Sequence, residues 1–247
     1  MDTLYSIIIP AYNEAQLLPK TLDDIKLAMA QTPFSGELIV CDNNSTDNTA
    51  EIARQSGARV VFEPHNQISR ARNSGARIAL GQYLIFIDAD TSISAELLLA
   101  ALQRMQSGNC CGGGAIVSLD HQMTVAERMG LWGWNQLSIH LRLAAGCFVY
   151  CRRDDFEKLG GFSEAVYASE ELWFSRQLHR LGKKRKQPFC IITEFSPHSS
   201  GRKGQWYSPS RQFLLLLTLL LFPFLVRYRR FCGFWYKRPA DKKDAED

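Results

Sequence analysis

Short apolar runs alternate with helix-like stretches between residues 5 and 87. The runs are YSIIIP, ELIVCD, RVVFE and QYLIFID, and stretches with helical periodicity at 14–30, 46–56 and 68–80 separate them. A short strand that is apolar throughout is buried on both faces, and such strands separated by helices form parallel βαβ units. The pattern therefore predicts an α/β fold with a Rossmann-like, mostly parallel central sheet flanked by helices.

Acidic and small polar residues follow three of these strands. They occupy residues 10–14 (PAYNE), 42–47 (DNNSTD) and 88–90 (DAD). In open parallel sheets, ligands bind at the carboxyl ends of the strands, so these residues are the candidate site. No dinucleotide-binding or P-loop glycine pattern follows any of the strands, and we therefore expect the acids to bind ribose hydroxyls, base N–H groups or a metal ion.

The two aspartates of LIFIDADTSI need a compensating partner, because an unpaired buried carboxylate costs several kcal/mol. Either the strand ends in water or it ends at a cation. Side chains two residues apart in a strand point the same way, so Asp88 and Asp90 can face one hard divalent cation. The alternative is an ordinary turn or helix cap, since Thr91, Ser92 and Ser94 precede the apolar stretch AELLLAAL.

Composition limits the architecture and the compartment. A chain of 247 residues with 46% hydrophobic content can form one substantial core or at most two small ones. The seven cysteines are odd in number and none is arranged as C-x-x-C, and no charged-then-apolar signal region follows Met1. These features predict a cytoplasmic protein with free thiols.

Charge is distributed unevenly along the chain. Residues 1–175 contain 13 Lys and Arg against 20 Asp and Glu, whereas residues 176–238 contain 14 Lys and Arg and a single acid, Glu194. A basic segment of this kind suits nucleic acid, phosphate-bearing ligands or an anionic membrane surface, and it is also compatible with an ordinary solvated face.

The basic segment contains a long apolar run. Residues 213–226 have only Thr218 as a polar member and are interrupted by Pro223. A bilayer-spanning helix needs about 20 apolar residues, so we expect segment 205–238 to lie at a membrane surface, with its arginines meeting anionic headgroups. The alternative is a helix packed into a neighbouring groove or a dimer interface. Residues 239–247 are expected to be disordered.

Four blocks of the sequence resemble a known family. SIIIPAYNEAQLLPKTL, ELIVCDNNSTDNTAEIA, ISRARNSGARIALGQYLIFIDADT and GGFSEAVYASEELWFSRQLHRLG are similar to successive blocks of family 2 glycosyltransferases, which have the GT-A fold. The resemblance runs from about residue 4 to 204 and implies that residues 1–204 form a GT-A domain. It also implies transfer of a sugar from a UDP- or GDP-linked donor to an acceptor hydroxyl of a lipid or glycan, with inversion, dependent on Mn²⁺ or Mg²⁺.

The resemblance also implies roles for individual residues. It places Asp90 as the direct metal ligand, with Asp88 nearer the ribose or acting through water and His198 completing the metal shell. It assigns catalysis to Glu171 as general base, next to Glu170. The residues implied in nucleotide-sugar binding are Pro10, Ala11, Tyr12, Glu14, Asp42, Arg70, Arg72, Asn73, Asp88, Ala89, Arg202 and Lys203.

Several of these assignments have plainer alternatives. Asn43 and Glu171 stand where the family usually has aspartate. The arginines of SRARNSGA could instead pair with Glu63 or Asp90 at the surface. Adjacent acids on a helix project about 100° apart, so Glu170 and Glu171 cannot both serve one point, and an exposed acidic pair at a helix start is also common.

Two other functions remain open from sequence. A sugar-1-phosphate nucleotidyltransferase uses a similar sheet, but it needs a glycine-rich basic segment after the first strand, which PAYNEAQLLP lacks. A catalytically silent nucleotide-sugar-binding scaffold at a membrane is the second alternative. The interpretation that we adopt is a glycosyltransferase at the cytoplasmic face of a membrane, with no nucleic acid as partner.

Overall fold

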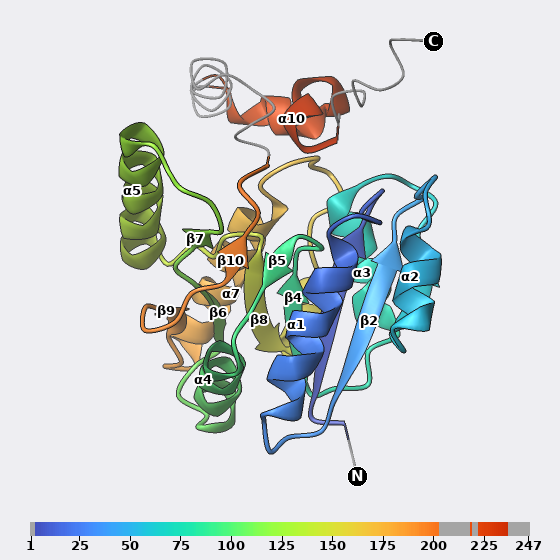
Figure 1. The fold of residues 1–247 in the computed structure, drawn as a ribbon. Helices are drawn as coiled ribbons and strands as arrows, with labels where there is room; N and C mark the ends of the chain where they lie inside the picture. The colour runs from blue at the N-terminus through green and yellow to red at the C-terminus, as the bar shows by residue number, and fades with distance from the viewer. Residues whose placement is uncertain (1–2, 203–217, 219–221, 237–247) are drawn as a thin grey trace.

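The computed structural model describes residues 3–202, 218 and 222–236, and it contains a seven-stranded mixed sheet (Figure 1). The strand order is β3-β2-β1-β4-β8-β6-β9. The strands are β1 (Tyr5–Ala11), β2 (Gly36–Asp42), β3 (Arg59–Phe62), β4 (Tyr83–Ile87), β6 (Gly112–Ala115), β8 (Phe148–Arg152) and β9 (Phe189–Ile192). Only β8 runs antiparallel to its neighbours among these strands. The predicted α/β fold with a mostly parallel sheet is confirmed.

Helices cover both faces of the sheet. They are α1 (Leu18–Ala30), α2 (Thr49–Gln55), α3 (Ile68–Arg77), α4 (Ala95–Gln106), α5 (Val125–Leu141), α6 (Arg153–Leu159) and α7 (Glu170–Lys184). The three stretches with helical periodicity in the sequence contain α1, α2 and α3. Helix α5 differs from the others because it stands away from the sheet, at the left of Figure 1.

The alternation of side chains along β1 divides the core in two. Tyr5, Ile7 and Ile9 pack on one face with α1 and α4, whereas Ile8 packs on the other face with α3, α6 and α7. Successive strand residues point to opposite faces, so a strand that is apolar at every position serves two cores. This is the physical reason why the short apolar runs form central strands.

A small second sheet fixes the geometry at the carboxyl ends of the large one. It contains β5 (Thr91–Ser92), β10 (His198–Ser199) and β7 (Ser118–Leu119) in the order β5-β10-β7. Thr91 pairs with Ser199 across the antiparallel β5–β10 ladder. The pairing places residues 200–202 next to Asp90, although more than a hundred positions separate them in the sequence.

The C-terminal segment folds back onto the loop that precedes α7. It contains the 3₁₀ helices η1 (Pro223–Arg227) and η2 (Arg229–Phe231) and the short helix α10 (Gly233–Tyr236). The Tyr167 N–H donates to the Val226 carbonyl at 2.6 Å, and Val226 and Cys232 pack against Val166 and Ala168. This part of the chain therefore docks against the α/β core.

Some predictions concern residues outside the described part of the structure. These are Lys203, most of the apolar run 213–226 and the tail 239–247. Within the described residues, no helix has both the length and the apolar character needed to cross a bilayer. The division of the chain into units at residues 204 and 238 stays a prediction.

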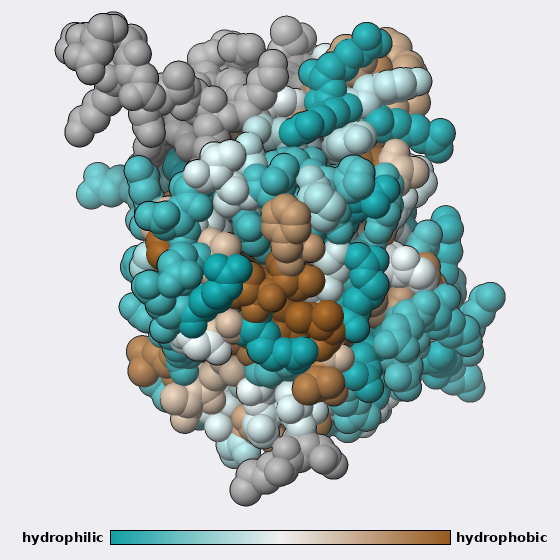
Figure 2. Space-filling view, turned by 90° about the vertical axis from the view of Figure 1, so that its right-hand side faces the viewer, coloured by the Kyte–Doolittle hydropathy of each residue, from teal (hydrophilic) through white to brown (hydrophobic). Residues whose placement is uncertain are grey.

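The edge strand β3 gives one side of the molecule an apolar character. Phe62 at the end of this strand is exposed, while Arg59 at its start pairs with Glu37 of β2. Figure 2 shows the side of the molecule on which this edge lies, with a cluster of hydrophobic side chains on an otherwise polar surface.

Candidate active site

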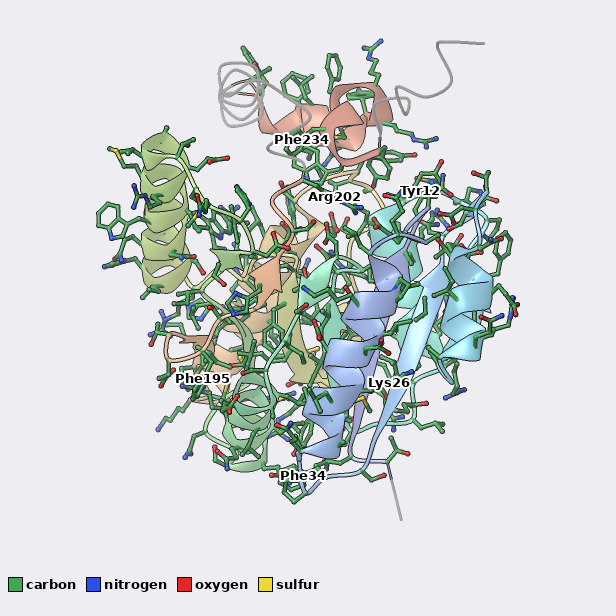
Figure 3. All side chains as sticks on the ribbon, viewed as in Figure 1. Tyr12, Lys26, Phe34, Phe195, Arg202 and Phe234 are labelled. Carbon is green, nitrogen blue, oxygen red and sulfur yellow. The ribbon has the colours of Figure 1, made fainter. Side chains whose placement is uncertain are left out.

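A cleft of about 310 Å³ opens at the carboxyl ends of the parallel strands. Many of the sequence-predicted residues line it, namely Pro10, Ala11, Tyr12, Glu14, Arg72, Asp88, Ala89, Asp90, Glu170, Glu171 and Arg202. Figure 3 shows Tyr12 and Arg202 at this end of the sheet, below the C-terminal segment that carries Phe234. The structure thus brings together residues from strand ends, helix starts and a late loop.

Asp88 and Asp90 follow β4 directly, and each faces an arginine. Asp88 Oδ1 lies 2.8 Å from Nη2 of Arg72. Asp90 Oδ2 accepts a hydrogen bond from the Ser200 hydroxyl at 2.6 Å and lies 3.3 Å from Nη2 of Arg202. Both carboxylates are therefore held by hydrogen bonds and cations rather than left in water, which favours the site interpretation over a plain helix cap.

Arg72 connects the two acidic sides of the cleft. Its side chain projects from α3 and is only 2% exposed. Nη1 binds Glu170 at 2.6 Å, while Nη2 donates to the Gly146 carbonyl at 2.9 Å as well as contacting Asp88. Burial alone would lower the pKa of the guanidinium, but the charges of Asp88 and Glu170 outweigh burial and raise it. Arg72 is thus a permanent cation inside the cleft, and it does not make the surface pair with Glu63 that the sequence left open.

The two acids at the start of α7 have different surroundings. Glu170 is buried and forms the ion pair with Arg72. Glu171 also lines the cleft, and burial together with repulsion from Glu170 raises its pKa to about 8, against the lowering effect of Arg72. The two neighbouring carboxyls therefore differ in their surroundings, because Glu170 forms the ion pair with Arg72 and Glu171 has a raised pKa.

Gly146 lies between Arg72 and Glu171. A Cβ at this position would lie 3.0 Å from Nη2 of Arg72 and 3.6 Å from Cδ of Glu171. A methyl group here would therefore crowd the Arg72 guanidinium, whereas its distance to Glu171 is that of ordinary van der Waals contact. The glycine lets the backbone carbonyl approach the guanidinium closely.

Four predicted residues lie outside the lining of the cleft. Asp42 accepts from the Ser45 N–H at 3.1 Å in the loop after β2. Arg70 pairs with Glu164 at 3.1 Å. The His198 side chain is exposed, and its Nδ1 lies 2.8 Å from the Ser118 hydroxyl oxygen. The fourth residue is Asn73, whose side chain forms hydrogen bonds with the backbone of Phe162.

Asn73 fastens the loop that leads to α7. Its side-chain nitrogen donates to the Phe162 carbonyl at 2.9 Å, and its oxygen accepts from the Phe162 N–H, also at 2.9 Å. Asn43, which directly follows β2, also binds a loop backbone: its side-chain amide donates to the carbonyls of Glu63 and His65. An aspartate at position 43 could accept hydrogen bonds but not donate these two.

Several residues at the site were not predicted from the sequence. Ser200 binds Asp90, and Trp235 and Tyr236 of α10 line the cleft. Trp134 of α5 is a further aromatic residue in the lining. Ser200 and α10 reach the site through contacts over a long sequence separation, for which no local sequence pattern is a signal.

The charges of the cleft suit a metal cation. Its lining contains five acids and two arginines, and the Arg202 guanidinium already lies between Glu14 and Asp90 as a cation. Among the described residues, no three His, Cys, Asp or Glu side chains converge as a complete metal cage. Two carboxylates in an acidic cleft nevertheless fit Mg²⁺ or Mn²⁺, since ions of this type bind one or two carboxylates and complete their shell with water and substrate phosphates.

The sheet and its acidic cleft define a GT-A glycosyltransferase fold. Residues 6–160 match the sequence model of Glycosyl transferase family 2, and the chain belongs to this family.

Two relatives show how far the sequence similarity extends. The 4,4'-diaponeurosporenoate glycosyltransferase of Staphylococcus haemolyticus is 38% identical over 104 residues, which is 39% of this chain and 27% of that protein. Glycosyltransferase AglE of Haloferax volcanii is 28% identical over 183 residues, covering 70% of this chain and 60% of that protein. The matches thus span less than two thirds of these relatives.

Solved structures share the fold at low sequence identity. The mannosyltransferase PcManGT of Pyrobaculum calidifontis, solved with GDP-Man and Mn²⁺, has a TM-score of 0.58 and 21% identity over 78% of this chain and 55% of that chain. Glucosyl-3-phosphoglycerate synthase of Mycobacterium tuberculosis, solved with Mn²⁺ and UDP, has a TM-score of 0.61 and 17% identity over 91% and 80%. S. aureus TarS with UDP-GlcNAc has a TM-score of 0.62 and 18% identity over 98% and 78%.

Proposed function

We propose that this protein is a metal-dependent, inverting glycosyltransferase that moves a sugar from a nucleoside diphosphate donor to an acceptor hydroxyl. The observation that carries the proposal is the position of Asp88 and Asp90, together with Glu171, in one cleft at the carboxyl edge of the sheet. Family membership and the nucleotide-sugar complexes of the structural neighbours support it.

The donor is placed along the carboxyl ends of the strands. The Tyr12 ring and the polar groups after β1 and β2 are suited to the base and ribose, because aromatic faces stack on bases and carboxylates accept from sugar hydroxyls. Asp90, with Asp88 beside it, would hold Mn²⁺ or Mg²⁺. When bound, such an ion supplies positive charge to the two donor phosphates and to the departing nucleoside diphosphate.

The protein's own residues handle the proton and the leaving group. The acceptor hydroxyl oxygen attacks the anomeric carbon, the bond from that carbon to the diphosphate oxygen breaks, and the hydroxyl proton goes to a carboxylate oxygen of Glu171. Arg72 pairs with Glu170, and Glu171 accepts the proton in its ionised form, whose share grows as the pH rises toward its pKa of about 8. General-base assistance of this kind is worth about 10² to 10⁴ in rate. Inversion follows from one displacement without a covalent intermediate.

Arg202 is proposed to bind the diphosphate of the donor. Its guanidinium pairs with Glu14 and Asp90. A guanidinium binds phosphate oxygens in a bidentate manner, so exchange of its carboxylate partners for the donor is chemically favourable. Lys203 follows in the chain and is proposed to add a second cation. On the acceptor side, the basic segment 206–238 is proposed to contact a membrane from which a lipid or glycan acceptor is presented.

Thermal unfolding with a panel of UDP- and GDP-sugars, with and without Mn²⁺, tests the proposal. A donor at about 100 times its Kd stabilises the protein by about 2.7 kcal/mol. We expect a Mn²⁺-dependent shift that Asp90→Asn removes. Glu171→Gln should keep the shift and lose turnover. A protein that shifts with no donor contradicts the function, and a Glu171→Gln variant with full activity contradicts the assignment of the base.

A further inference from the structure

Helix α5 has its apolar side turned outward. Five large apolar residues of this helix are between 53% and 69% exposed, namely Val125, Met129, Trp132, Leu137 and Leu141. At about 100° per residue they spread over roughly half of the helix circumference. Exposed apolar residues are common singly, but five lie on this one helix, with the exposed His140 among them, and they give its outer side a largely apolar character.

Two polar residues of α5, Asn135 and Ser138, face the protein, whereas Arg128 and His140 are exposed. The Asn135 side chain donates to the Val117 carbonyl and accepts from the Val117 N–H, both at 3.0 Å. The Ser138 hydroxyl is fully buried and donates to the Leu143 carbonyl at 2.7 Å. A helix of a water-soluble domain normally has the reverse arrangement, with its apolar stripe on the core.

The start of the helix is fixed by local contacts. Thr124 and Glu127 form a capping box, in which each side chain satisfies a backbone N–H of the first turn. Among the described residues, none covers the five exposed apolar side chains.

A second exposed element has matching chemistry. In segment 222–231, the aromatic residues Phe222, Phe224, Tyr228 and Phe231 are exposed together with three arginines. Arg230 lies 4.8 Å from the ring centroid of Phe231 and 5.7 Å from that of Tyr228. Arginines interleaved with aromatic rings suit the boundary between anionic headgroups and acyl chains.

Both elements border the same cleft. Trp134 comes from α5, and Trp235 and Tyr236 come from α10, which follows the aromatic and basic segment. Figure 1 shows α5 and α10 at the same end of the molecule as the carboxyl ends of the strands. A surface that contacts both elements would therefore lie at the mouth of the cleft.

We infer that the outer face of α5 is a docking surface for an anionic lipid bilayer, with segment 222–231 as its basic partner. The apolar residues of α5 insert at the level of the headgroups, and Arg227, Arg229 and Arg230 bind lipid phosphates. A second copy of the chain is a poorer occupant, because a stable interface buries about 800 Å² per partner and a single convex helix presents a narrow stripe. Docking does not depend on catalysis, although access of a membrane-bound acceptor to the cleft rests on the proposed function.

Vesicle co-sedimentation of the full chain tests the inference. The probes are vesicles of phosphatidylcholine alone and of phosphatidylcholine with phosphatidylglycerol. The test variant is Met129→Gln/Trp132→Gln. The matched control is Leu27→Gln/Leu80→Gln, whose residues are 60% and 62% exposed near the amino ends of the strands. We expect the anionic vesicles to bind the protein, the test variant to lower the partition coefficient about tenfold or more, and the control to leave it unchanged.

Three outcomes would overturn the inference. These are no binding of the wild-type protein to anionic vesicles, equal loss in both variants, and a wild-type dimer that the α5 variant dissociates. A large loss of thermal stability in the α5 variant alone would show that another part of the chain covers this face, since exposed substitutions normally change stability by less than about 0.5 kcal/mol. Donor-dependent thermal shifts without vesicles should be the same in all variants, which separates a failure of docking from a failure of the proposed transfer reaction.

Discussion

Replacing Glu171 by glutamine should stabilise the protein at alkaline pH. Burial and the neighbouring Glu170 raise the pKa of Glu171 to about 8 in the folded protein, from an ordinary glutamate value of 4.5. Below pH 4.5 the carboxyl is protonated in both states and contributes nothing. Between pH 4.5 and 8 the unfolded chain releases the proton while the folded protein retains it, so stability falls as the pH rises.

The size of this effect follows from the pKa. One pKa unit corresponds to about 1.4 kcal/mol, so the full difference would cost the wild-type protein about 5 kcal/mol above pH 8. Glu171 and Glu170 titrate as a pair, so part of the effect belongs to Glu170. We therefore expect the substitution of Glu171 alone to change the free energy of unfolding by about 2–4 kcal/mol. Glutamine has almost the same shape and no charge, so the variant should escape the loss.

Urea unfolding of the metal-free protein between pH 5 and pH 9 measures this pH-dependent stabilisation. The quantity of interest is the free energy of unfolding of Glu171→Gln minus that of the wild-type protein. This difference should be near zero at pH 5 and should grow to its full value by pH 9. Glu157→Gln is the control, because the Glu157 side chain is exposed. A difference that stays constant across the pH range would refute the assignment of Glu171 as a buried, proton-retaining acid.

Three further changes test other parts of the cleft. Arg72→Met leaves Glu170 buried without its counterion and should cost about 3–5 kcal/mol in urea unfolding, while Arg72→Met/Glu170→Leu should recover at least half of the loss. Gly146→Ala should lower kcat/KM about tenfold or more in steady-state kinetics with little change in unfolding, because the methyl group displaces the Arg72 guanidinium. Arg202→Ala should increase the affinity for Mn²⁺ without nucleotide about threefold to tenfold in an electron paramagnetic resonance titration, because it removes a cation that competes at Asp90. An unchanged value in one of these three measurements would contradict the role assigned to the substituted residue.

The sheet could be predicted because burial leaves a local trace in the sequence. A strand such as YSIIIP supplies Ile7 to one core and Ile8 to the other, so its consecutive central residues are apolar. The position of Asp88 and Asp90 at the site follows from the same logic, since polar residues directly after a buried strand lie at the edge of the sheet.

The remaining part of the site depends on contacts that leave no local pattern. Asn73 was expected to bind the donor, but its amide holds Phe162, 89 positions away. The aromatic side of the cleft comes from Trp235 and Tyr236, in a segment for which the apolar run and the basic charge favoured membrane contact over packing into a neighbouring groove. Periodicity reports which face of an element is buried, but it does not report against which distant segment that face packs.

The return of the C-terminal segment to the cleft has a consequence for synthesis of the protein. On the ribosome, the strands and the acids that follow them emerge well before α10, so the sheet can form while one wall of the cleft is missing. A nascent chain stalled before residue 223 would form this cleft without Trp235 and Tyr236. These two aromatic residues therefore join the cleft only after the strands and the acids that follow them have been synthesised.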